Sequence, residues 1–180
     1  ALDECPADAL KAHPFALLVL MRSMFNWRNI PKMLELKALL LAALEEHPEL
    51  PAEERGNLLG ECDLIMSFLC YNDISAMSRL HRSASAQMSR PAISIRSSGG
   101  WTFGSPSVLM MFYRAPGELA GELAEMAECM PHYYKITNGH GQGAETIMRA
   151  EAAFVQGRFT DAHIALESAY AQIEGNGQEN

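Results

Sequence analysis

A pattern of apolar residues that recurs about every 43 residues is the strongest constraint on how this chain can fold. The same position in successive copies of the pattern is held by Met33, Met77, Leu119 and Ala162. Further apolar or small residues follow each of them at offsets of three or four, seven and eleven, which is the spacing of one stripe on an amphipathic helix. Eight positions before each anchor stand Phe25, Leu69, Met111 and Phe154. Each unit is therefore expected to contain two helices.

Residues that start or stop helices lie between the two expected helices of each unit. Pro31 and Pro116 suit the first turn of a helix. Asp73 and Thr160 suit N-cap positions, and Gly157 suits the end of a helix. The predicted hairpins span roughly 13–47, 51–88, 105–131 and 142–174, with an irregular loop over 89–105. We expect an all-α fold, a right-handed superhelix of about four antiparallel TPR-like hairpins that form a single domain over 1–180.

Composition limits the class of protein. The chain has 180 residues, of which 48% are hydrophobic and 20% charged, as is ordinary for a soluble domain. No apolar run is long enough to span a bilayer, so no membrane association is expected. The four cysteines form no CxxC pair, which argues against a zinc ribbon or a disulfide framework and predicts a cytoplasmic location. The polar tail and the missing initiator Met suggest a fragment of a larger protein.

Charge is distributed unevenly along the chain, although the net charge of −8 discourages nucleic-acid binding. Between Ile74 and Gly117 there is no Asp or Glu, and the arginines in this stretch are Arg79, Arg82, Arg90, Arg96 and Arg114. Guanidinium groups beside aromatic rings suit a carboxylate, phosphate or sugar. The first candidate ligand site therefore comprises Arg90, Arg96, Trp101, Phe103 and Arg114. The alternative is that the arginines pair with acidic helix faces, such as Glu118, Glu122 and Glu125.

The stretch GGWTFGSPS, Gly99 to Ser107, interrupts the third unit. Gly104 and Ser107 stand where the second unit has the core residues Cys62 and Ile65, so the first helix of the third hairpin should start late. We expect it to begin at Pro106 with Ser105 as its cap. The missing turns should leave a gap that Trp101 and Phe103 either fill or line.

A second candidate ligand site follows Met130, where a loop is expected to carry His132, Tyr133, Tyr134 and His140. The alternative is a linker whose tyrosines cap the core. Cys129, His132 and His140 match no standard zinc spacing, so no metal site is predicted. There is no Gly-x-Ser-x-Gly, no HExxH and no cysteine or serine with activating neighbours, so we predict no catalytic residues and no enzyme.

The last unit resembles a tetratricopeptide repeat, because Ala150, Gly157-Arg158-Phe159, Ala162 and Ala169 occupy the places of that motif. Two further stretches, SRPAISIRSSGGWTFGSPS and ECMPHYYKITNGHGQGAE, are more specific than the generic repeat. Together with the repeats, they resemble the central helical-repeat region of LuxR-family, MalT-like, ATP-dependent transcriptional regulators.

The resemblance implies a signal-sensing or protein-interaction module that binds a small-molecule inducer or a regulatory protein, contacts the parent's ATPase domain and takes part in self-association. In such parents, ATP is bound by an N-terminal module and DNA by a C-terminal helix-turn-helix. Neither a Walker A sequence nor a plausible recognition helix occurs in these residues, so no cofactor is expected here. The alternative is a pure protein-interaction scaffold or oligomerisation segment without a small-molecule site.

Overall fold

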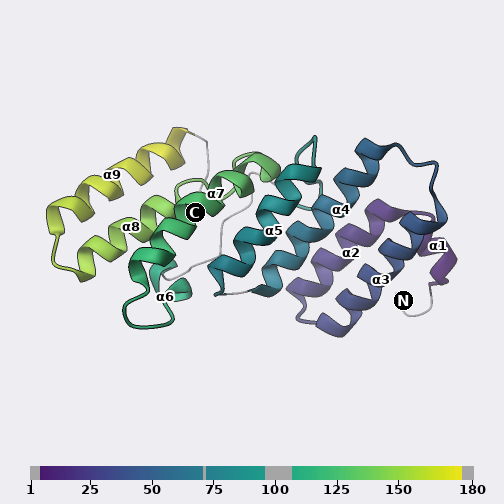
Figure 1. The fold of residues 1–180 in the computed structure, drawn as a ribbon, viewed down its shortest axis with the longest axis horizontal. Coiled ribbons are helices and arrows are strands. Elements are labelled where there is room, and N and C mark those ends of the chain that lie inside the picture. Colours follow the sequence, from purple (N-terminus) through teal and green to yellow (C-terminus); the bar gives the residue numbers. More distant parts are fainter. Residues whose placement is uncertain (1–4, 71, 96–106, 176–180) are drawn as a thin grey trace.

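The computed structural model describes residues 5–70, 72–95 and 107–175, and within them it contains helices and no strands. The elements are α1 (Ala7–Lys11), α2 (Pro14–Asn26), α3 (Ile30–Glu46), α4 (Ala52–Ser67), the 3-10 turn η2 (Phe68–Cys70), α5 (Ile74–Gln87), α6 (Val108–Phe112), α7 (Leu119–Thr137), α8 (Ala144–Val155) and α9 (Phe159–Gly175). They lie side by side in an elongated row, with α1 near one end and α8 and α9 at the other (Figure 1). The predicted all-α fold is confirmed.

Three pairs of consecutive helices pack side by side as hairpins: α2 with α3, α4 with α5, and α8 with α9. The side chain of Asn29 caps α3 by accepting from the Lys32 N–H, and Asp73 caps α5 by accepting from the Ala76 N–H. Gly157 turns the chain between α8 and α9 with φ 75°, a value that favours glycine. Local chemistry thus fixes the turns at the places that the repeat indicates.

The third unit departs from this arrangement. Its first helix, α6, has 5 residues and begins at Val108, because Ser107 accepts a hydrogen bond from the Met110 N–H at 3.1 Å. The expected start at Pro106 with Ser105 as cap is therefore corrected; those two residues lie outside the described part of the chain. With so short a first helix, α7 packs along α5, while α6 packs on α8.

The helix α7 also continues beyond residue 131, where the third hairpin was expected to end. Pro131 lies inside it, and an interior proline costs about 3 kcal/mol because it removes a backbone hydrogen bond. Buried Met130, Tyr133 and Ile136 offset this cost by packing in the core shared with α5. The helix ends at Thr137, where Asn138 takes a left-handed conformation. Tyr133 therefore lies on a helix and not in the expected loop.

The buried side chains form two hydrophobic clusters. One joins α2 and α3 with Leu58, Cys62 and Ile65 of α4, and the other runs from Leu64 of α4 through α5, α6 and α7 to α8. Only Ala162 and Ala169 of α9 are buried. No helix in the described residues is both long and apolar enough to cross a bilayer.

Two glycines on one face of α4 allow α5 to approach closely. A Cβ atom added to Gly56 would lie 2.8 Å from the carbonyl oxygen of Gln87. One added to Gly60 would lie 2.5 Å from Cγ of Met88 and 3.0 Å from the carbonyl oxygen of Ala84. The contact at Gly56 is with backbone, which cannot move aside without shifting the end of α5.

The variant Gly56→Ala should therefore lose stability by about 1–3 kcal/mol, although alanine favours helix. Gly121→Ala in α7 is the matched control, since nothing lies within 4 Å of its added Cβ, and it should gain about 0.5–1 kcal/mol. Urea unfolding of both variants checks this. A Gly56→Ala protein as stable as the wild type would disprove the close approach.

Candidate functional site

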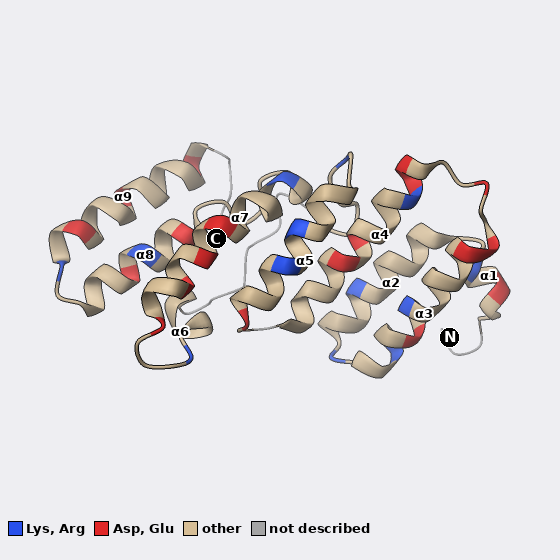
Figure 2. Ribbon diagram, viewed as in Figure 1, with Lys and Arg blue, Asp and Glu red and all other residues tan. Residues whose placement is uncertain are grey.

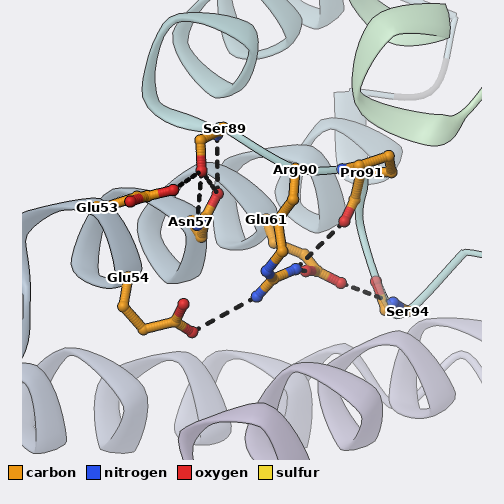
Figure 3. Close-up of polar contacts among 8 residues, drawn as sticks. All are labelled: Glu53, Glu54, Asn57, Glu61, Ser89, Arg90, Pro91 and Ser94. Carbon is orange, nitrogen blue, oxygen red and sulfur yellow. Dashed lines mark hydrogen bonds and ion pairs between the residues drawn. The ribbon is translucent and has the colours of Figure 1, made fainter.

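The segment after α5 is clamped onto the polar face of α4 (Figure 3). Asn57 accepts from the Ser89 N–H at 2.9 Å through Oδ1 and donates to the Ser89 hydroxyl at 3.1 Å through Nδ2. The same hydroxyl donates to Glu53 at 2.7 Å. Further along, the N–H of Ala92 donates to the carbonyl of Ile136 at 2.7 Å. The segment thus ties α4 to the end of α7.

Arg90 is held inside this clamp. Its guanidinium lies 3.6 Å from the carboxylate of Glu61 and 3.5 Å from that of Glu54, and it donates to the carbonyl of Pro91 at 3.2 Å. It also lies over the ring of Phe15, with 5.2 Å to the centroid. Glu61 is fully buried and accepts from the Ser94 N–H at 2.6 Å. A buried carboxylate needs a cation beside it, so this arginine has a structural partner in place of a ligand.

We predict that Arg90→Met destabilises the fold by about 3 kcal/mol, because it leaves the Glu61 charge buried and unpaired. Adding Glu61→Gln should restore part of the loss, since the buried group is then neutral. Unfolding by urea measures both. If Arg90→Met alone were as stable as the wild type, Arg90 would not be needed to neutralise Glu61 and would be available for a ligand.

Two other arginines from the acid-free stretch are also paired with acids. Arg82 contacts Glu128 at 2.9 Å and Glu125 at 3.3 Å, both on α7. Arg114 contacts Asp73 at 3.2 Å, at the start of α5. Basic and acidic positions are accordingly interleaved along the row of helices (Figure 2). These contacts support the alternative of pairing with acidic helix faces. Arg96, Trp101 and Phe103 lie outside the described residues.

The residues of the second candidate site hold the turn after α7. The Tyr133 hydroxyl and Nδ1 of His140 are 2.8 Å apart, and both side chains are buried. Tyr134 donates to Glu145 and accepts from the Gly143 N–H at 3.2 Å. Burial raises the pKa of Tyr133, and burial together with the Glu145 carboxylate raises that of Tyr134. The hydroxyls are therefore neutral internal ties, as expected of tyrosines that cap the core.

His132, the remaining residue of this site, is half-buried on α7.

A buried polar chain that the sequence did not indicate links α4, α5 and α7. Ser67 donates to the Leu64 carbonyl at 2.6 Å and lies 2.9 Å from Nε2 of His81, whose Nδ1 lies 3.1 Å from the Cys129 sulfur. Since the Ser67 proton is used, Nε2 must donate to Ser67 and Nδ1 must accept from the thiol. Every polar group of this buried network therefore has a hydrogen-bond partner.

This histidine and cysteine cannot form a reactive ion pair. Burial lowers the pKa of His81 to about 4 and raises that of Cys129 to about 12. The neutral imidazole and the protonated thiol are therefore the stable forms, which is the opposite of what an activated cysteine requires. The cluster is a buried structural network.

A cavity of about 20 Å³ lies next to His81, among side chains of η2, α5, α6 and α7, including Phe68, Phe112 and Met126. It is large enough for one water molecule, but the polar atoms of His81 and Tyr133 are engaged elsewhere, so its surface offers no partner to a water. Trp101 and Phe103, which were expected to fill or line a gap in the third unit, lie outside the described residues.

We predict that the neutral state of His81 makes stability depend on pH. Its pKa is about 4 in the folded chain and near 6.5 when unfolded, so the contribution is complete above pH 6.5 and falls as the pH drops towards 4, by about 3 kcal/mol in all. Urea unfolding at several pH values should show this slope in the wild type and in His13→Gln, an exposed control whose side chain caps no helix. His81→Gln should lack it; an unchanged slope would contradict the assignment.

An open groove of about 330 Å³ lies between α8 and α9. Arg149 and Arg158 line it, together with the small side chains of Ala153, Ala165 and Ser168. Arg158 is engaged by Asp161 at 2.7 Å, whereas Arg149 is exposed and forms no ion pair within the described residues. Ile164 also lines the groove and is largely exposed.

The groove therefore combines an arginine that has no ion-pair partner among the described residues with an apolar contact, and sequence reasoning did not select it. The sequence feature that could have indicated the groove is the pair of arginines, Arg149 and Arg158, on either side of the last hairpin turn.

No group of three or more His, Cys, Asp or Glu side chains in the described residues is arranged to hold a metal ion. No family model, curated protein or solved structure matches this chain.

Proposed function

We propose that this chain is a protein-interaction module that binds a segment of another protein in the groove between α8 and α9. The observation that carries the proposal is the side chain of Arg149, which is exposed at a groove of about 330 Å³ without an acidic partner among the described residues. Ile164 supplies an apolar surface in the same groove. A segment with one carboxylate and one apolar side chain fits this chemistry, because the guanidinium pairs with carboxylates in a fixed geometry.

The wider context of the proposal rests on the sequence. On the resemblance stated above, the module is the sensor region of a LuxR-family, MalT-like transcriptional regulator and adopts a right-handed TPR-like superhelix. ATP and DNA are bound by other parts of that parent. Binding of a regulatory protein or an inducer shifts the parent between inactive and active states, which requires different affinities for the two.

The geometry of the described residues favours a protein partner over a small inducer. Arg90 and Arg114 are paired with acids, and Tyr133 and His140 with each other. The small cavity next to His81 has room for a single water molecule. An open groove suits a peptide better than a metabolite.

Binding to an array of short synthetic peptides that vary in Asp or Glu and in Leu or Phe tests the proposal. Peptides with both residue types should bind with Kd on the order of micromolar, and Arg149→Ala should weaken them about tenfold. Arg79→Ala, an exposed arginine on α5, is the matched control and should change nothing.

Equal weakening by both variants, or no selectivity for acidic peptides, would refute the groove as the site. If a small metabolite stabilised the wild type against heat but not Arg96→Ala or Trp101→Ala, that result would instead favour a small-molecule site in the acid-free stretch.

A further inference from the structure

The outer edge of the last hairpin carries a strip of large apolar residues that nothing in the described chain covers. Its members are Phe154 (62% exposed), Phe159 (63%), Leu166 (52%) and Tyr170 (60%). The rings of Phe154 and Phe159 meet edge to face at 5.5 Å, which joins the end of α8 to the start of α9. The strip is distinct from the groove, because Ile164 and Leu166 are two positions apart and so lie about 160° apart around the helix, on nearly opposite sides.

The positions equivalent to Phe154 in other repeat units show how this residue is expected to pack. Phe25 occupies in the first hairpin the place that Phe154 occupies in the last. Its ring lies 5.5 Å from that of Phe68, in the next hairpin, where it is partly buried. Met111, at the same place in the third unit, is buried against the following helices. This position therefore packs against a neighbouring helical unit, and in the last hairpin that neighbour has to come from outside the described residues.

The spacing along α9 indicates the kind of helix that fits. Phe159, His163, Leu166, Tyr170 and Ile173 follow one another at intervals of four, three, four and three, which is the seam by which two helices pack together. The seam is nearly symmetric about Leu166. An antiparallel copy of α9 would thus place Leu166 against Leu166 and Phe159 against Ile173.

The charges at the two ends of α9 suit the same arrangement. Arg158 stands eight positions before Leu166, and Glu174 stands eight positions after it. A two-fold axis at Leu166 brings each arginine next to the glutamate of the other copy, twice per dimer. A parallel arrangement would instead place like charges together.

We propose that this chain forms a two-fold symmetric dimer in which the strip on α9 packs antiparallel against the same strip of a second copy. Arg158 lines the groove and also faces the second copy, but Arg149 takes no part in this contact, so the proposal stands independently of the proposed function.

Light scattering after size exclusion, followed by sedimentation over a range of concentrations, measures the association. The wild-type chain should be a dimer, and Leu166→Glu should raise the dimer Kd at least tenfold, since each dimer would face two carboxylates across an apolar seam. Met110→Glu is the matched control, because Met110 is 75% exposed on α6, outside the strip. Circular dichroism should show that both variants keep the wild-type helix content.

A disulfide experiment tests the two-fold geometry. In a Cys5→Ser background, which removes the exposed native thiol, Leu166→Cys should oxidise to a single covalent dimer, whereas Met110→Cys should not. A wild-type chain that stays monomeric at all concentrations overturns the proposal. So does a dimer that Leu166→Glu leaves intact, or a ladder of linked chains in place of one dimer.

Discussion

Because α6 has only 5 residues, α5 and α7 pack directly against each other, and the remaining arrangement depends on this contact. Apolar burial supplies most of its free energy, through residues such as Met77 and Met126 in the shared core. Polar ties along the interface set its register: His81 with Cys129, Arg82 with Glu128, and the Lys135 amine with the carbonyl of Ser85 at 2.9 Å. A slip of one turn would break all three ties together.

The order of helices could be predicted because local sequence patterns determine it. The apolar stripes after Met33, Met77 and Ala162 correspond to α3, α5 and α9, and residues such as Asn29 and Asp73 cap helices where the sequence indicated turns. The late start of the third unit was also visible, as a loss of core residues. Its cap is Ser107 because that hydroxyl reaches the backbone of the first turn, a choice among nearby serines that composition does not make.

The continuation of α7 through Pro131 and the buried chain around His81 could not be predicted, for one physical reason. Both depend on contacts between residues far apart in sequence. Local propensity ends a helix at a proline, but burial of Tyr133 and Ile136 against α5 outweighs that preference. Likewise, nothing near His81 in the sequence shows that Ser67 and Cys129 will meet both of its ring nitrogens.

The acid-free stretch shows how charge can be segregated along a sequence and balanced in space. Arg82, Arg90 and Arg114 each meet carboxylates that belong to other segments: α7, α4 and the residue before α5. Exposed pairs of this kind add little free energy, but an arginine opposite the wrong helix would lack its acid, and the buried Glu61 would lack its cation. The arginines therefore act mainly on specificity, by selecting how successive hairpins pack. Arg149, by contrast, has no ion-pair partner among the described residues, and it lies at the groove between α8 and α9, which is why we propose it as the contact for a partner.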